Sequence, residues 1–347
     1  MTTDAGAPRA RAAESGARRL PTVNDVARLA GVSKGTVSKV LNGRAGIATD
    51  TREQVESAAR QLGYRPNLQA LSLMEGRTGT VGLLTHDLEG RFCLPILMGA
   101  EDALGAGKLS VFLCDARGDA IREQYHLEAL LARRVDGLIV VGDRAAPRAS
   151  LGDLPVPVVY ASGPSMNPDD TSVVPDDVQA GRAGADHLLS IGRRRIAYIG
   201  GDPSYPGAHR RAEGVTSLLS ERGLELVVPP MLNAWTETWG LQAARQILAK
   251  RPDVDAIMCG NDQIARGVVD ALREQGKSVP GDVAVLGHDN WETLVLAARP
   301  PLSSIDANYQ RLGGKAAQLL FAAMSGSPEP GLHYIDSTVV PRESTLA

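Results

Sequence analysis

Two short amphipathic segments near the N-terminus, within residues 22–42 (TVNDVARLAGVSKGTVSKVLN), constrain this chain most. Apolar side chains recur in them at three- and four-residue spacing, as on the buried face of a helix; they are Val23, Val26, Ala27, Ala30, Val37, Val40 and Leu41. Thr22 and Asp25 can form a capping box at the first helix. Gly31 supplies a left-handed exit, and Ser33 starts the second helix. The sequence therefore predicts a helix, a four-residue turn and a second helix.

The second of these helices leaves a small cationic face uncovered. Once its apolar stripe is buried, its first turn and outer face present Lys34, Gly35, Thr36, Ser38 and Lys39. Two cations, two hydroxyl groups and bare backbone suit a groove lined by phosphates. The alternative is a helix pair that binds nothing, which the agreement of caps, turn and basic face disfavours.

The same residues, followed by Gly43 and by GYRPN at 63–67, resemble the DNA-binding headpiece of the LacI/GalR family of bacterial repressors. The resemblance implies that part of the second helix faces the major groove of double-stranded DNA; the residues concerned are Lys34, Gly35, Thr36 and Lys39. It further implies a set of contacts to the phosphate backbone, made by Ser38, Asn42, Tyr64 and Asn67.

A third helix is expected at residues 50–62, where the apolar stripe can pack on the first two helices. The family usually has Ser at the position of Ala48, so the absence of a hydroxyl there shifts the predicted N-cap to Thr49 or Asp50.

Residues 66–75 follow as a helix-forming stretch that is too short to be stable alone in water. The resemblance makes this stretch a hinge helix that orders on DNA and pushes Leu73 into the minor groove, with Ala70 at the small-residue position beside it. The alternative is a plain linker helix with Leu71 and Leu73 in a core.

Charge is distributed unevenly along the chain. Residues 1–78 carry 12 Lys and Arg against 7 Asp and Glu, whereas the remainder carries 25 against 33. A basic module on an acidic body fits a protein that binds nucleic acid at one end. Residues 1–20 have no apolar core of the kind a secretory signal requires, and we interpret them as a disordered tail. Because no run of about 18 apolar residues occurs, we expect no membrane span and a cytoplasmic location.

From Thr80 onward, short apolar strands alternate with helices, the pattern of parallel sheets covered on both faces. Strands are expected at 80–87, 109–115, 135–143, 156–162, 194–202, 224–230, 254–262 and 283–289. Helices are expected at 96–104, 123–133, 178–191, 209–222, 237–250 and 263–275, with a polar stretch at 163–177. Two α/β halves joined by crossing strands predict a cleft at the carboxyl ends of the strands.

The second half also resembles the LacI/GalR family, in GRRRIAYIGG at 192–201, VPGDVAVLGHD at 279–289 and PRESTL at the end. The resemblance covers 21–346 and implies a headpiece at 21–66, a hinge at 67–78 and a periplasmic-binding-protein-like core at 79–347. It places the lobes of this core at about 79–177 plus 307–337, and at 178–306 plus 338–347.

Ligand-binding residues are expected at the carboxyl ends of the strands. The carboxylates, the Arg and the amide found there offer the hydrogen-bond partners that hydroxyl-rich ligands need. The family resemblance and strand ends together select Phe92, Asp115, Arg211, Trp235, Asn261 and Asp289. Each has a structural alternative, since a strand-end Asp often only caps a helix and a Trp is often part of a core. Arg91 departs from the family pattern and adds a charge that would favour an acidic or phosphorylated ligand.

Two other classes of protein fit the sequence less well. An enzyme would need a catalytic constellation, but the six histidines are scattered and neither His-Glu-x-x-His nor Gly-x-Ser-x-Gly occurs. A two-lobed solute-binding protein without a transcriptional role would need a signal peptide and no basic headpiece. We therefore expect a homodimeric transcriptional repressor of a pseudo-palindromic operator, controlled by a sugar or sugar derivative, with no cofactor, catalytic residue or metal site. The sequence leaves open the operator, the effector's identity and whether it induces or co-represses.

Overall fold

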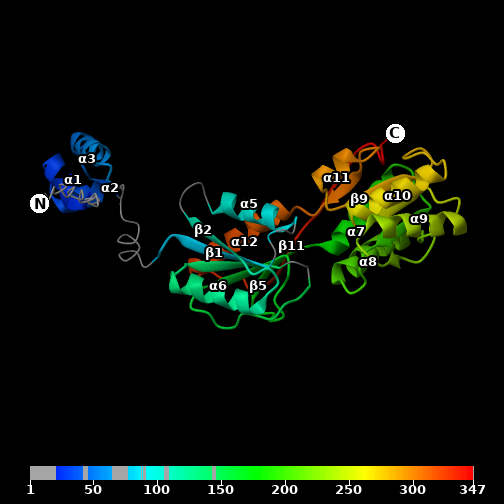
Figure 1. Ribbon diagram of the computed structural model, residues 1–347, viewed down its shortest axis with the longest axis horizontal. Helices are drawn as coiled ribbons and strands as arrows, with labels where there is room; N and C mark the ends of the chain where they lie inside the picture. Colours follow the sequence, from blue (N-terminus) through cyan, green and yellow to red (C-terminus); the bar gives the residue numbers. More distant parts are fainter. Residues whose placement is uncertain are drawn as a thin grey trace, which may run out of the picture. The chain divides into compact units, whose positions relative to one another are not determined.

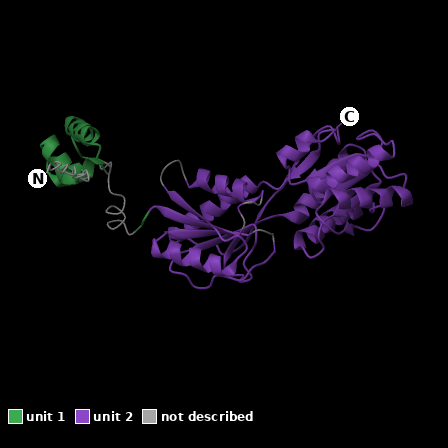
Figure 2. Ribbon diagram, viewed as in Figure 1, with its two compact units in different colours: residues 1–78 green, residues 79–347 purple. Residues whose placement is uncertain are grey.

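The computed structural model describes residues 21–41, 46–64, 77–86, 88, 91–104, 109–142 and 146–346. The chain divides into two compact units, residues 1–78 and residues 79–347 (Figure 2). The predicted tail at 1–20 and the predicted hinge residues 67–75 lie outside the described residues.

The first unit contains α1 (Val23–Ala30), α2 (Lys34–Leu41) and α3 (Thr49–Leu62). Their buried faces form one core of Val26, Ala27, Val37, Val40, Val55, Ala58 and Ala59. Asp25 Oδ2 accepts from Thr22 N at 2.9 Å and from Thr22 Oγ1 at 2.6 Å, and Gly31 ends α1 at φ 65°. The helix–turn–helix prediction is confirmed, except that the turn has three residues, 31–33, and not four.

The predicted cap of α3 is wrong. The helix begins at Thr49, and Ala48 occupies the N-cap position without a side-chain hydrogen bond. Ala48 meets the geometric requirement through its backbone alone, because its extended ψ of 143° directs its carbonyl to Arg52 N at 3.1 Å. A capping hydroxyl therefore does not set this boundary.

The described part of the second unit contains two six-stranded sheets. In the first lobe the order is β11-β5-β4-β3-β1-β2, and all neighbours are parallel. The strands are β1 (Thr80–Thr85), β2 (Ser110–Asp115), β3 (Gly137–Val141), β4 (Val158–Ala161), β5 (Thr171–Pro175) and β11 (Gly331–Ile335). Helices α5 (Cys93–Ala103) and α12 (Tyr309–Met324) cover one face, and α6 (Ala120–Ala132) covers the other (Figure 1).

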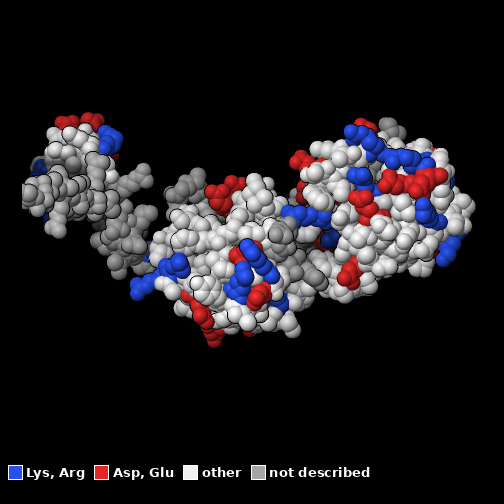
Figure 3. Space-filling model, viewed as in Figure 1, with Lys and Arg blue, Asp and Glu red and all other residues white. Residues whose placement is uncertain are grey.

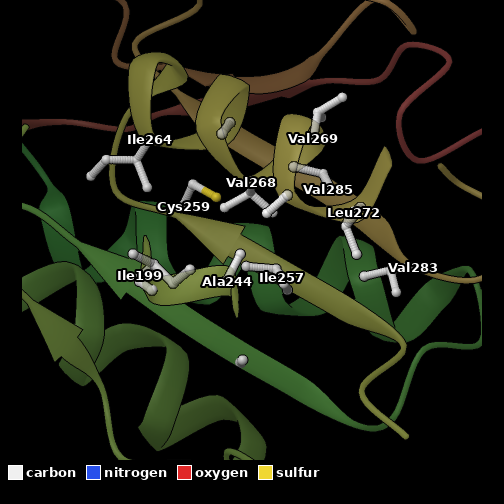
Figure 4. Packing of buried hydrophobic residues seen from close by; sticks show 14 of the residues in the cluster. Ile199, Ala244, Ile257, Cys259, Ile264, Val268, Val269, Leu272, Val283 and Val285 are labelled. Carbon is white, nitrogen blue, oxygen red and sulfur yellow. The ribbon is translucent and has the colours of Figure 1, made fainter. Parts of the chain in front are cut away.

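The second lobe repeats this design with the order β12-β10-β9-β8-β6-β7. Its strands are β6 (Ile196–Gly200), β7 (Met231–Leu232), β8 (Ala256–Cys259), β9 (Ala284–His288), β10 (Ser303–Asp306) and the antiparallel β12 (Thr338–Val340). Helices α7 (Asp177–Ser190) and α8 (Pro206–Glu221) cover one face. Helices α9 (Glu237–Lys250) and α10 (Asp262–Glu274) cover the other face. Ile199, Ile257 and Val268 belong to the core beneath them, which Figure 4 shows. Helix α11 (Glu292–Ala297) follows β9. The predicted fold class is confirmed.

Two segments differ from the sequence-based expectation. The strand expected at 224–230 is wrong, because the segment makes only one sheet-like bond, from Val227 N to Ile196 O at 2.9 Å, before Pro229 and Pro230, which have no N–H to donate. Pairing resumes as the two-residue β7. The polar stretch at 163–177 instead contains a strand, β5, which is buried at every position.

Glycines set the spacing of the helix pairs in the described core. A Cβ atom at Gly99 of α5 would lie 1.7 Å from the carbonyl oxygen of Gln310, and one at Gly313 of α12 would lie 1.9 Å from that of Ile96. The same reciprocal arrangement recurs between α7 and α8 and between α9 and α10, with Gly181, Gly214, Gly240 and Gly267. Backbones therefore touch where these helices cross.

Three chain segments pass between the two lobes. They follow β5, β10 and β11, so each lobe is built from two separate stretches of the sequence. None of the helices in the described residues is long and apolar enough to cross a membrane. On the visible face of this unit, acidic and basic side chains are intermixed, as Figure 3 shows.

Candidate functional site: an exposed helix and a cleft between two lobes

Helix α2 presents the residues that the sequence predicted for DNA contact. Lys34, Gly35 and Lys39 are exposed, whereas Thr36 and Ser38 are half-buried. Ser33 Oγ accepts from Thr36 N at 3.1 Å and lies 2.9 Å from Thr36 Oγ1, so this pair fixes the first turn of the helix. The two lysines therefore extend from a helix whose start is held in place.

Tyr64 lies beyond the end of α3. Its ring packs against the helical core, and its N–H donates to Ala59 O at 2.9 Å. Burial raises the pKa of Tyr64. The other predicted DNA contacts, Asn42, Asn67, Ala70 and Leu73, lie outside the described residues.

In the second lobe, Arg211 of α8 is almost fully buried at the carboxyl ends of the strands. Its Nε donates to Asp177 Oδ1 at 2.8 Å, and an Nη atom donates to Gly260 O at 2.7 Å. Burial opposes the guanidinium charge, but the carboxylates of Asp177 and Asp289 outweigh this and raise the pKa of Arg211 above its usual value. Arg211 is therefore a fixed cation, oriented by the start of α7 and the end of β8.

Asp289 follows β9 in a left-handed conformation, with φ 92°. His288 Nδ1 lies 2.9 Å from its Oδ1, and Arg91 of the first lobe donates to its Oδ2. Burial opposes ionisation, but the hydrogen bond from His288 and the charges of Arg91 and Arg211 outweigh it and lower the pKa of Asp289. Asp289 therefore links the two lobes as an anion. The backbone N–H of Trp291, just before α11, donates to Asp262 Oδ2 at 2.8 Å and not to Asp289.

Aromatic rings line the cleft from both lobes. Trp235 meets Tyr205 edge-to-face with ring centroids 5.6 Å apart, and the Arg211 guanidinium lies 5.8 Å from the Trp235 ring. In the first lobe, Phe92 packs on Tyr309 with centroids 4.7 Å apart. Such rings can cover the apolar face of a bound molecule.

A cavity of about 360 Å³ brings most of the predicted ligand residues together. Its lining includes Phe92, Arg211, Trp235, Asn261 and Asp289. Asn261 also caps α10, since its Oδ1 accepts from Ile264 N at 2.8 Å. A second cavity of about 860 Å³ shares Arg91, Phe92, Asp289 and Tyr309 with the first.

Asp115 does not join this group. It ends β2, and its Oδ1 accepts from Arg117 N at 3.0 Å, so it organises the following turn; within the described residues it lines neither of these cavities. Conversely, sequence reasoning missed Asp177, Tyr205 and Tyr309. Asp177 stands at the start of a predicted helix, where an acidic residue is commonplace, and the two tyrosines carried no distinguishing signal.

Comparison with known proteins bears on both units. Residues 22–67 match the family model described as bacterial regulatory proteins, lacI family, and residues 185–345 match the periplasmic binding protein-like domain. The HTH-type transcriptional repressor PurR of Mannheimia succiniciproducens is 32% identical over 308 residues, which are 87% of this chain and 91% of the relative. The chain belongs to the LacI family. It is accordingly a DNA-binding transcriptional regulator and not an enzyme.

Other LacI-family members are similar to this chain over nearly all of its length. The HTH-type transcriptional regulator CelR of Thermobifida fusca is 33% identical over 340 residues, 94% of this chain and 99% of the relative. A solved CelR–cellobiose complex has a TM-score of 0.63 at 30% identity, covering 93% of this chain and 99% of that one. The Lac repressor dimer bound to operator and the anti-inducer ONPF has a TM-score of 0.73 at 27% identity, covering 95% and 100%.

Proposed function

We propose that this LacI-family regulator is a homodimeric repressor of a pseudo-palindromic operator, released or recruited by a small-molecule effector that is a sugar or sugar derivative. In this proposal residues 21–66 bind DNA, 67–78 form the hinge, and 79–347 bind effector and dimerise in the cytoplasm. The observation that carries the proposal is the 360 Å³ cavity where Arg211, Asp289 and Trp235 converge, in a chain that also exposes the lysines of α2.

The DNA-binding half rests on the exposed face of α2. Lys34 and Lys39 are both exposed and lie about 7.5 Å apart along the axis of a helix that buries Val37 and Val40, so both can reach DNA that lies against the exposed side of the helix. Gly35 lies between them without a side chain, which lets backbone come close to DNA. We assign Lys34, Gly35, Thr36 and Lys39 to the major groove, and Ser38, Asn42, Tyr64 and Asn67 to the phosphates. Ala70 and Leu73 are assigned to the minor groove.

The effector half rests on the chemistry of the cavity wall. A carboxylate and a guanidinium can each engage two neighbouring hydroxyl groups, and Trp235 and Phe92 can cover the C–H faces of a ring. Asn261 adds an amide whose oxygen caps α10. The similar solved CelR–cellobiose complex supports a sugar. The rival reading, a solute-binding protein without a transcriptional role, leaves the LacI-type headpiece unexplained.

The proposal is tested in two linked measurements on the full-length protein. Selection from a random pool of double-stranded DNA should yield an operator with two inverted half-sites, and a thermal-shift screen of sugars, sugar phosphates, nucleosides and purines should yield an effector. A ligand at a hundredfold excess over its Kd should stabilise by about 2.7 kcal/mol. The effector must then change operator affinity. An effector that binds without altering operator affinity would refute allosteric control.

A further inference from the structure

An ion pair joins the two lobes across the cleft. Arg91, two residues before α5 in the first lobe, donates to Asp289 Oδ2 of the second lobe. Its guanidinium lies 4.8 Å from the Phe92 ring centroid and 4.9 Å from that of Trp291. The Asp289 side chain is 4% exposed and that of Arg91 is 24% exposed. Both residues line both cavities, so the pair stands between them.

The other charged side chains in the wall of the smaller cavity also have hydrogen-bond partners within the protein. Of its described lining residues, Arg91 and Arg211 are cationic and Asp202 and Asp289 are anionic. Arg211 is bound to the buried Asp177, and Asp202 Oδ1 accepts from Ser204 N at 2.8 Å. Neither guanidinium is left without a carboxylate partner.

This pairing decides which ligands fit. An anionic ligand that approaches Arg91 would either compete with Asp289 for the guanidinium or lie beside this buried carboxylate, which repels the ligand's own negative charge. An uncharged hydroxyl group can donate to Asp289 and leave Arg91 in place. We propose that Arg91, held by Asp289, is the specificity-determining residue that excludes anionic effectors and admits uncharged polyhydroxylated ones. This inference rests on the proposed effector site, and it reverses the expectation that an added Arg favours acidic ligands.

The test uses inorganic phosphate as the probe, titrated into full-length protein and followed by calorimetry. Asp289→Asn keeps the shape of the side chain but frees the Arg91 charge, so phosphate affinity should rise at least tenfold over the wild type. The double variant Arg91→Gln/Asp289→Asn should lose this gain. Asp186→Asn is the matched control, because it frees Arg222 from an exposed pair, 3.1 Å apart, on the surface of the second lobe.

Two outcomes would overturn the proposal: wild-type phosphate binding that Arg91→Gln abolishes, or a gain in Asp289→Asn no larger than in Asp186→Asn. If Asp289→Asn does not fold, Arg91→Gln provides the converse test. This variant removes the cation that is paired with Asp289, so its affinity for methylguanidinium should be tenfold higher than that of the wild type. No gain in affinity would refute the pairing. Neither titration involves DNA or the natural effector. A failure of the regulatory function would instead appear as operator affinity that no effector changes.

Discussion

Arg211 and Asp177 form a buried ion pair, with 2.8 Å between Nε and Oδ1 and side chains that are 5% and 1% exposed. The pair ties α8 to the first residue of α7, and the second hydrogen bond of Arg211, to Gly260 O, ties both to the end of β8. Three elements of the second lobe are thus joined directly beside the Trp235 ring.

Asp177→Ala should therefore destabilise the protein strongly. Removing one partner of a buried pair leaves the other charge uncompensated, at a cost of about 3–5 kcal/mol. Denaturant unfolding of the full-length protein measures this as a lower midpoint. Glu221→Ala is the control, because it breaks an exposed pair with Arg182 and should change the midpoint little. Equal effects in the two variants would show that burial does not govern the Arg211 pair.

Much of the fold was predictable because it depends on local signals. Thr22, Asp25 and Gly31 mark the ends of α1, and near-continuous apolar runs mark the parallel strands. β5 was missed because its Thr and Ser side chains are buried among neighbouring strands, a tertiary effect that composition does not show.

The site was predictable residue by residue but not as a set of partners. Arg211, Trp235, Asn261 and Asp289 follow strands of one lobe, so strand order places them together. The Arg91–Asp289 pair joins residues 198 positions apart, which no local pattern could reveal. Asp115 carried the same strand-end signal as Asp289, yet it bonds its own turn. A strand-end carboxylate therefore predicts a location but not a role.

Lys39→Ala should weaken operator binding, because Lys39 is exposed on the last turn of α2. If it contacts a phosphate, the slope of log affinity against log salt should fall by about 0.9. If it reads a base edge, preference at one position should relax by about 1–3 kcal/mol. Lys250→Ala, at an exposed position of α9, should leave both quantities at wild-type values. A Lys39 variant that matches Lys250→Ala would exclude Lys39 from the DNA interface.

Gly313→Ala and Gly314→Ala should differ sharply although they are adjacent in α12. A Cβ at Gly313 would meet Ile96 O at 1.9 Å, which forces α5 and α12 apart at a cost of about 1–3 kcal/mol. A Cβ at Gly314 meets nothing nearer than Gly99 O at 3.5 Å, so the helix preference for Ala should dominate and stabilise by up to about 1 kcal/mol. Unfolding midpoints of the two variants give the comparison, and a shift of the same sign in both would contradict it.

Asp262 should make stability depend on pH. Burial, reinforced by the charge of Asp289, raises its pKa from 3.8 to about 8, although Ser304 Oγ and Trp291 N both donate to it. Between these two values the folded state holds a proton that the unfolded state has lost, so rising pH favours unfolding. Asp262→Asn should reduce this negative slope by up to about 1.4 kcal/mol per pH unit. Unfolding free energies measured at about pH 5 and about pH 7 test it, and parallel wild-type and variant curves would show that Asp262 is ionised throughout.

The three crossings after β5, β10 and β11 also bear on how ligand preference can change over generations. Neither lobe is encoded by one uninterrupted stretch of codons. α12 and β11 belong to the first lobe, but in the sequence they follow every strand of the second sheet except β12. A single recombination break between two relatives would therefore join strands of mismatched parentage within one sheet. The headpiece can be exchanged as a block, because its residues are contiguous and belong to a unit of their own, residues 1–78. The cleft is instead changed by point substitution at positions such as Arg91.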